Sequence, residues 1–174
     1  MLGKYNRYRV LKVFLFSPGD SFRLRELSRL SKISPPSVMA YLKEFEKEGL
    51  IKMYKKREVP YYTSNVDSEI LVIYKKLAVL YEIYDSGVVE YLWEKLAPDA
   101  IILYGSYAKG EFTERSDIDL FIIGKEKSLN LDEYEKRLGK NIHLMFEKEV
   151  KNIPNNLKNN LCNGIALKGY FKVF

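Results

Sequence analysis

Residues 100–123 contain two apolar runs separated by a polar stretch, and this arrangement restricts the fold more than any other part of the chain. The first run, AIILY, is continuously apolar, as expected for a buried strand, and a Gly-Ser pair and a short helical turn follow it. The second run, SDIDLFII (116–123), alternates, so Asp117 and Asp119 leave the same face of a strand. We therefore expect two strands of one sheet with a polar site between them.

The residue types at this site suit a metal ion and a phosphate. Residues two apart on a strand are separated by about 6.7 Å along the chain, so the two carboxylates can converge on one cation. Mg²⁺ prefers one or two carboxylates together with water and phosphate oxygens. Gly105 lets the backbone approach a phosphate closely, and Ser106 offers a hydroxyl and an N–H beside it. Lys109 is either a further phosphate contact or a solvated helix lysine.

The stretch LYGSYAKGEFTERSDIDLFII resembles the minimal nucleotidyltransferases of the DNA polymerase beta superfamily, and the likeness covers roughly residues 85–174. The resemblance implies that Gly105 and Ser106 hold the β- and γ-phosphates of a nucleoside triphosphate, with ATP the first choice. It also implies that Asp117 and Asp119 bind Mg²⁺. Members of the family transfer a nucleoside monophosphate to a hydroxyl, and pyrophosphate leaves.

A departure from the family pattern concerns its usual third carboxylate, which lies on a later strand. In this chain that strand is NIHLMFE (141–147), and the corresponding position is His143, the only histidine. Histidine can act as a base near pH 7 but is a poor ligand for Mg²⁺. Three interpretations stay open: a substitute catalytic base, a domain that binds Mg-NTP with little or no catalysis, or an ordinary strand residue. In the last case Glu147 or Glu149 could replace the carboxylate if the strand registers differently.

Charge divides the chain into two parts. Of 29 Lys and Arg and 23 Asp and Glu, residues 1–66 hold 14 and 6, a net charge of +8, whereas residues 67–174 have a net charge of −2. A basic first part is a candidate for nucleic-acid binding. The single cysteine, Cys162, is expected to be a small buried residue. With no signal peptide and no apolar run of membrane-spanning length, we expect a cytoplasmic protein without membrane contact.

The basic part shows the element order of a winged helix-turn-helix. Helical spacing predicts a helix over about 5–15 and a second over 24–30, whose apolar stripe is Leu24, Leu27 and Leu30. Ser34 is placed to cap a third helix, with Pro35 in its first turn and an inward face of Val38, Leu42 and Phe45. After Gly49 two short strands follow, joined by a basic turn. The stretch 24–51 resembles the winged helices of bacterial and archaeal repressors.

In a winged helix the third helix enters the major groove of double-stranded DNA and the wing contacts the backbone. The candidate DNA-binding residues are polar and point outward from these two elements: Ser37, Tyr41, Lys43, Lys52, Lys55, Lys56 and Arg57. The lysines and the arginine would supply salt-dependent phosphate contacts. The alternatives are a solvated charged surface or a winged helix that binds protein.

Between the two parts, residues 67–84 read as a helical linker with an apolar stripe of Ile70, Leu71, Tyr74, Leu77, Leu80 and Tyr81. The width of this stripe suits a dimer interface, so we expect a homodimer. A break at DSG (85–87) precedes a second helix that ends before Pro98. The C-terminal segment predicts a short helix and then a strand flanked by glycines.

The predicted fold is therefore α+β, with a winged helix-turn-helix (1–66), a helical linker (67–84) and a small mixed-sheet nucleotidyltransferase-like domain (85–174). The whole chain resembles archaeal proteins that join these modules, and the resemblance implies a HEPN-type partner protein for some relatives. Two functions stay open. One is a Mg-dependent nucleotidyltransferase that also binds DNA; the other is a transcriptional regulator or antitoxin-like protein whose transferase domain is catalytically degenerate.

Overall fold

The computed structural model describes residues 2–170, and the chain forms two compact units, Met1–Ala78 and Val79–Phe174. The division falls within helix α4 (Glu69–Ser86). Each unit combines helices with its own sheet, so the predicted α+β class is confirmed.

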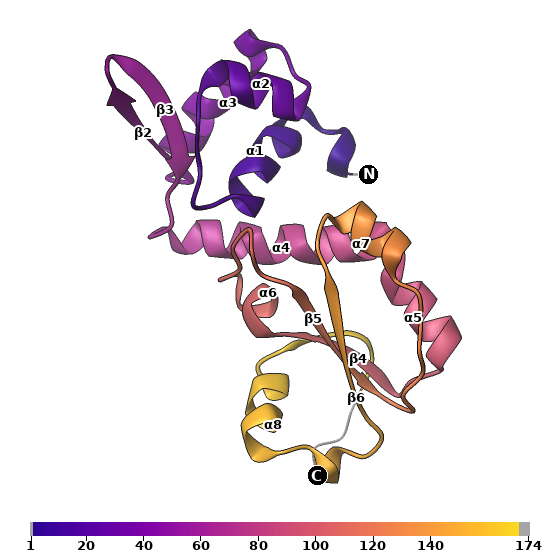
Figure 1. Cartoon of the computed structure of the whole chain (residues 1–174). Coiled ribbons are helices and arrows are strands. Elements are labelled where there is room, and N and C mark those ends of the chain that lie inside the picture. The colour runs from indigo at the N-terminus through magenta and orange to yellow at the C-terminus, as the bar shows by residue number, and fades with distance from the viewer. Residues whose placement is uncertain (1, 171–174) are drawn as a thin grey trace. The chain divides into compact units, whose positions relative to one another are not determined.

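The first unit has the element order of a winged helix. Helices α1 (Asn6–Phe16), α2 (Leu24–Ser31) and α3 (Pro35–Lys47) precede the hairpin of β2 (Ile51–Lys56) and β3 (Val59–Ser64), which projects from them in Figure 1. A short 3-10 helix, η1 (Leu2–Lys4), and the two-residue strand β1 (Ser21–Phe22) complete the unit. Strand β1 pairs with β3, which gives an antiparallel sheet in the order β1-β3-β2; the sequence had suggested only two strands.

The core of this unit forms where the predicted apolar faces of the helices meet. Val38, Leu42 and Phe45 of α3 are fully buried as predicted. The prediction was wrong for Leu30, which is 53% exposed. Ser31 takes the inward position one turn after Leu27, and its hydroxyl donates a hydrogen bond to the Leu27 carbonyl (2.6 Å). Leu30 is thereby rotated to the outer surface of α2.

Ser34 occupies the N-cap position of α3 as predicted, but its hydroxyl does not cap a backbone N–H. It lies 3.0 Å from the hydroxyl of Ser37 instead. Pro35 begins the helix, where its missing N–H has no helical partner to lose.

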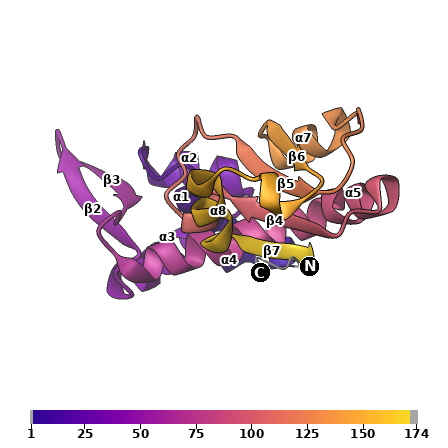
Figure 2. The same cartoon turned by 90° about the horizontal axis from the view of Figure 1, so that it is seen from below.

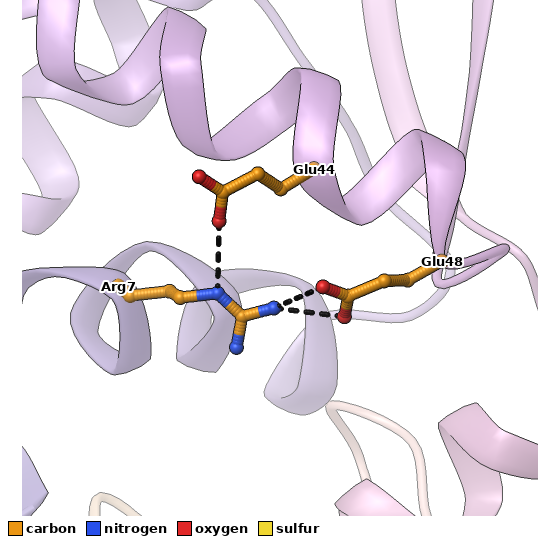
Figure 3. Close-up of polar contacts among 3 residues, drawn as sticks. All are labelled: Arg7, Glu44 and Glu48. Atoms are coloured by element: carbon orange, nitrogen blue, oxygen red, sulfur yellow. Dashed lines mark hydrogen bonds and ion pairs between the residues drawn. The ribbon is translucent and has the colours of Figure 1, made fainter.

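Arg7 connects α1 to the C-terminal half of α3 (Figure 3). Its Nε donates to Glu44 (3.1 Å) and its Nη2 donates to Glu48 (2.6 Å), and the guanidinium lies 5.0 Å from the centre of the Phe45 ring. The single guanidinium of Arg7 therefore pairs with two carboxylates that are one helical turn apart at the C-terminal end of α3.

Helix α4 buries only part of the predicted apolar stripe. Leu71, Ala78, Val79 and Ile83 are buried, and the inward face also includes Lys75. Ile70 and Leu77, which belonged to the predicted stripe, are 41% and 58% exposed. The apolar pattern runs around much of the helix, so hydrophobic spacing did not distinguish the packed face from the open one. Gly87, with φ +82°, breaks the chain between α4 and α5 (Val88–Leu96), as predicted.

The second unit is built on a four-stranded mixed sheet in the order β6-β5-β4-β7. Strands β5 and β6 are parallel, and the other pairs are antiparallel. The remaining elements of this unit are β4 (Ala100–Tyr104), α6 (Gly105–Lys109), β5 (Ile118–Ile123), α7 (Asp132–Leu138), β6 (Ile142–Glu147), η2 (Val150–Asn152), α8 (Asn155–Cys162) and β7 (Ile165–Gly169).

Helix α8 covers one face of this sheet (Figure 2). Leu161 of the helix packs in one apolar cluster with Ile102 and Phe121. The next residue, Cys162, was predicted to be buried. It is exposed instead, because it lies on the outer side of α8. The final residues, 171–174, lie outside the described part of the chain.

Strand β5 begins two residues later than predicted, at Ile118. Ser116 belongs to a turn instead, and its hydroxyl accepts a hydrogen bond from the Thr113 N–H (3.0 Å). Asp117 therefore lies at the entrance to the strand, and Asp119 lies within it.

Candidate functional site

The residues predicted to act together meet at one edge of the second sheet. Because β4 is antiparallel to β5 and β6 is parallel to it, the C-terminal end of β4 lies beside the N-terminal ends of β5 and β6. The register pairs Tyr104 with Asp119 and Asp119 with His143. The Gly-Ser pair that follows Tyr104 and the histidine 24 residues after Asp119 thus flank the same carboxylate.

Gly105 makes the closest backbone approach in this cluster. Its φ is +72°, a conformation that favours glycine, and a Cβ at this position would lie 2.6 Å from Oδ2 of Asp119. No side chain can be added here unless the carboxylate moves. Ser106 is half-buried directly after it, and the exposed Lys109 ends the five-residue helix α6.

Asp119 is the more buried of the two aspartates. Its side chain is 29% exposed, and Oδ1 lies 3.7 Å from Nδ1 of His143. This distance fits an ion pair but is longer than a hydrogen bond. Burial raises the pKa of Asp119; His143 opposes the rise and Asp117 adds to it. Burial, with a smaller contribution from Asp119, also raises the pKa of the Tyr104 hydroxyl.

Asp117 is exposed and accepts a hydrogen bond from the side-chain amide of Asn141 (3.1 Å). Asn141 was not predicted as a site residue. Its signal in the sequence is its position two residues before His143, which places both on one side of the same chain segment. In α6, burial raises the pKa of the Tyr107 hydroxyl, and the charge of Asp117 contributes a smaller rise. The Tyr107 ring stacks on Phe112.

The register decides which residue occupies the third position. His143 pairs with Asp119, whereas Glu147 pairs with Ile123 at the far end of β5. A shifted register that would bring Glu147 to the site is therefore absent, and His143 is the β6 side chain next to Asp119. The His143 side chain is 71% exposed, so it is not part of a packed core.

Among residues 2–170, no group of three or more His, Cys, Asp and Glu side chains is arranged to hold a metal ion. A Mg²⁺ site of one or two carboxylates, completed by water and phosphate oxygens, does not need such a group. The oxygen ligands of Asp117 and Asp119 fit this requirement, and the absence of a side chain at Gly105 leaves Oδ2 of Asp119 unobstructed, since a Cβ there would lie 2.6 Å from it.

In the first unit, the candidate DNA-binding residues differ in their exposure. Lys43, Lys52, Lys55, Lys56 and Arg57 are exposed, whereas Ser37 and Tyr41 are half-buried. The Tyr41 ring stacks on Phe45, so it faces the core more than the sequence suggested. Lys52 pairs with Asp67 (2.7 Å) and Lys55 with Glu58 (3.6 Å), and both pairs are exposed to solvent.

The wing has an aromatic cluster that was not predicted from the sequence. Tyr54 and Tyr61 stack with 5.7 Å between ring centres, and the guanidinium of Arg23 lies 4.9 Å from the Tyr61 ring. Arg23 also donates to the Tyr61 hydroxyl (2.7 Å). The signal was the cross-strand pairing of two tyrosines, which becomes visible only once the hairpin register is known.

Two family models match the chain. Residues 86–166 match the nucleotidyltransferase domain, and residues 24–52 match the winged helix-turn-helix DNA-binding family. The first match contains the whole sheet edge described above, and the second runs from α2 to the start of β2.

Three proteins of Methanocaldococcus jannaschii, each named "putative protein adenylyltransferase", are similar to parts of the chain. One is 41% identical over 69 residues, which cover 35% of this chain and 69% of that protein. Another is 53% identical over 32 residues, 18% of this chain and 26% of the relative. The third is 67% identical over 24 residues, which cover 14% of this chain and 24% of that relative. The chain thus spans only about a quarter of the length of two of these relatives.

One further property concerns membranes. Within residues 2–170, no helix combines the length and the apolar character that a bilayer-crossing segment requires.

Proposed function

Because the chain belongs to the nucleotidyltransferase family, we propose that residues 85–174 bind a nucleoside triphosphate, ATP first, together with Mg²⁺ and transfer its nucleoside monophosphate to a hydroxyl acceptor. The observation that carries the proposal is the sheet edge: a glycine in close contact with a carboxylate, a second carboxylate at the strand entrance, and a histidine paired with the first in register. The names of the relatives support a protein as the acceptor.

In the proposed reaction the acceptor oxygen attacks the α-phosphorus, the bond from this phosphorus to the bridging oxygen of the β-phosphate breaks, and pyrophosphate leaves. Asp117 and Asp119 would hold Mg²⁺, which polarises the phosphate and offsets the charge of the attacking and leaving oxygens. Gly105 and Ser106 would hold the β- and γ-phosphates. His143 would take the proton of the acceptor hydroxyl, because it is exposed to solvent and lies beside Asp119.

The test uses isosteric substitutions of the two aspartates. Asp117→Asn and Asp119→Asn remove a negative oxygen without changing side-chain size, and each should weaken Mg·ATP binding by at least about tenfold, measured by titration calorimetry. Asp99→Asn is the matched control, because Asp99 is an exposed aspartate just before the N-terminal end of β4, away from the site. Unchanged binding in the Asp117 and Asp119 double variant contradicts the site.

A second candidate function rests on the third position, where His143 replaces a carboxylate. In this candidate the domain binds Mg·ATP without turnover and the chain acts as a DNA-binding regulator. Pyrophosphate release that requires Asp117 and Asp119 supports the enzyme. Intact Mg·ATP binding without release, for any nucleotide and divalent metal, supports the regulator.

We propose double-stranded DNA as the partner of the winged helix, with contacts from α3 and the wing. Lys55, Lys56 and Arg57 lie at the exposed end of the hairpin. Their replacement by alanine should reduce the slope of log affinity against log salt concentration by up to about three, one per lost phosphate contact. An unchanged slope contradicts a DNA-contacting wing.

A further inference from the structure

A cavity of about 520 Å³ opens beside Asp117 in the second unit. One wall is the turn 114–117, and the other is formed by α7 and the segment that leads from α7 into β6. A volume of this size is within the range of sites that enclose a small ligand or a few side chains.

The order of the strands separates this cavity from the phosphate-binding turn. Strand β5 lies between β4, which leads into Gly105-Ser106, and β6, which follows the cavity wall. Asp117 and Asp119 therefore lie between the proposed site of the β- and γ-phosphates and the cavity. In a phosphoryl transfer the attacking and leaving oxygens lie roughly in line, on opposite sides of the phosphorus. The acceptor must then approach from the β6 side.

We propose that this cavity seats the acceptor, and that the acceptor is a polypeptide segment with an acidic residue next to its reactive hydroxyl. The proposal rests on the proposed function, since it assumes that the β- and γ-phosphates lie at Gly105-Ser106. It adds the place and the chemistry of the second substrate.

The cavity lining argues against a nucleic-acid acceptor. Of the described residues that form it, none has an aromatic or aliphatic side chain on which a base could stack. A polar polypeptide segment does not need such a stacking surface.

Two cations in the lining are available to a ligand. Lys140 donates to the backbone oxygen of Glu114, and Glu135 accepts from the N–H of Ile142 (2.8 Å), so both serve the protein itself. Arg115 and Lys136 face the cavity, and within residues 2–170 neither side chain forms an ion pair. They lie on opposite walls, one in the turn and one on α7, and can together bind one carboxylate of the acceptor.

The experiment is a charge swap read against a matched set of peptides. Each peptide contains one tyrosine, serine or threonine flanked by Asp, Ala or Lys, and transfer is measured as labelled AMP from ATP labelled at the α-phosphate. The wild-type chain should label the Asp-flanked peptide at least about tenfold more efficiently than the Lys-flanked peptide. The double variant Arg115→Glu, Lys136→Glu should reverse this order. The double variant Lys125→Glu, Lys148→Glu is the control. These exposed lysines follow the C-terminal ends of β5 and β6, whereas the cavity lies at the N-terminal ends of the two strands.

The proposal is overturned if the charge-swapped variant keeps the wild-type order of peptide preference. It is also overturned if the protein labels oligonucleotides in place of peptides. Fluorescence anisotropy with the same peptides, Mg²⁺ and a non-hydrolysable ATP analogue tests the seat without turnover. Absence of peptide binding to the nucleotide-loaded protein also overturns the acceptor assignment. Calorimetry with Mg·ATP on each variant reports separately on the nucleotide, so failure of nucleotide binding contradicts the proposed function and is distinguishable from loss of the acceptor.

Discussion

The partly buried position of Asp119 disfavours the ionised form of its carboxylate. A carboxylate with most of its surface buried is poorly solvated, and its pKa is raised although His143 lies 3.7 Å away. Unless a cation is bound, the charged form is destabilised in the folded chain relative to the unfolded one. Binding a cation would relieve this conflict, as expected for a site that keeps a charge for function.

Replacing Asp119 by asparagine should therefore stabilise the metal-free protein at neutral pH while it removes a proposed metal ligand. The pKa is raised in the folded state, so the destabilisation is fully present above that pKa and disappears as the pH falls through it toward the unfolded value. The gain in melting temperature should follow the same course in scans from pH 8 to pH 3.5. A lower melting temperature for Asp119→Asn at pH 7 contradicts this reading.

Gly105 allows a second prediction at the scale of single residues. Gly105→Ala introduces a Cβ at positive φ, which costs about 1–2 kcal/mol, and also displaces the Asp119 carboxylate. Gly139→Ala is the matched control, since Gly139 has φ +66° and nothing within 4 Å of the added Cβ. Both variants should lose stability, but only Gly105→Ala should lose Mg·ATP affinity in calorimetry. Equal affinity in the two variants argues against close phosphate approach at Gly105.

At the scale of elements, α3 is held by contacts at its C-terminal half. Glu44 and Glu48 are one turn apart on this helix, where like charges repel, and Arg7 of α1 neutralises both (Figure 3). The Arg7 side chain is 38% exposed, so water screens the pair and its stabilising effect is limited. Its position over Phe45 adds packing to the charge interaction.

Arg7→Ala should lower the free energy of unfolding of the first unit by about 1 kcal/mol, measured by chemical denaturation. Adding Glu44→Gln and Glu48→Gln to this variant should restore part of the loss, because the two facing charges are then removed. Arg25→Ala, at an exposed arginine of α2, serves as control. An Arg7→Ala variant as stable as the control shows that solvent screening removes the contribution.

At the scale of the whole molecule, the chain joins a basic winged helix to a mildly acidic nucleotidyltransferase domain through a helix that belongs to both units. The part of α4 in the first unit exposes three large apolar side chains: Ile70, Ile73 and Leu77. Their spacing of three and four residues places them on one side of the helix. The homodimer predicted from the sequence would use this stripe, called the α4 stripe below, since an isologous contact would cover the same stripe on both copies.

Ile73→Glu combined with Leu77→Glu should convert a dimer to a monomer, because two charges per copy would then face their equivalents across the α4 stripe. Light scattering after size-exclusion chromatography measures the mass, which should fall by half. Lys76→Glu is the control on the same helix. A wild-type monomer at micromolar concentration, or a dimer that the double variant retains, contradicts the assignment of the α4 stripe.

Much of the fold follows from local chemistry and was predictable. Helix periodicity, the break at Gly87, and the change from helical spacing to strands after Gly49 are properties of neighbouring residues, and they correctly predicted the order of the main helices and strands. The Gly-Ser and Asp-x-Asp pattern predicted the family, which the comparisons confirm. Helix α7 and the short strand β1 were not predicted, since neither has a long apolar period.

The sequence by itself determined the family through its Gly-Ser and Asp-x-Asp pattern. It also predicted the two carboxylates as a pair, because the side chains of residues two apart in an extended segment leave the same side. Only the tertiary structure decided what surrounds them. The parallel pairing of β5 with β6 joins residues 24 apart and brings His143, not Glu147, to Asp119. It also buries Asp119, brings Asn141 to Asp117 and opens the cavity beside them. Local spacing cannot encode these relations, because strand register and burial depend on which distant segments pack together.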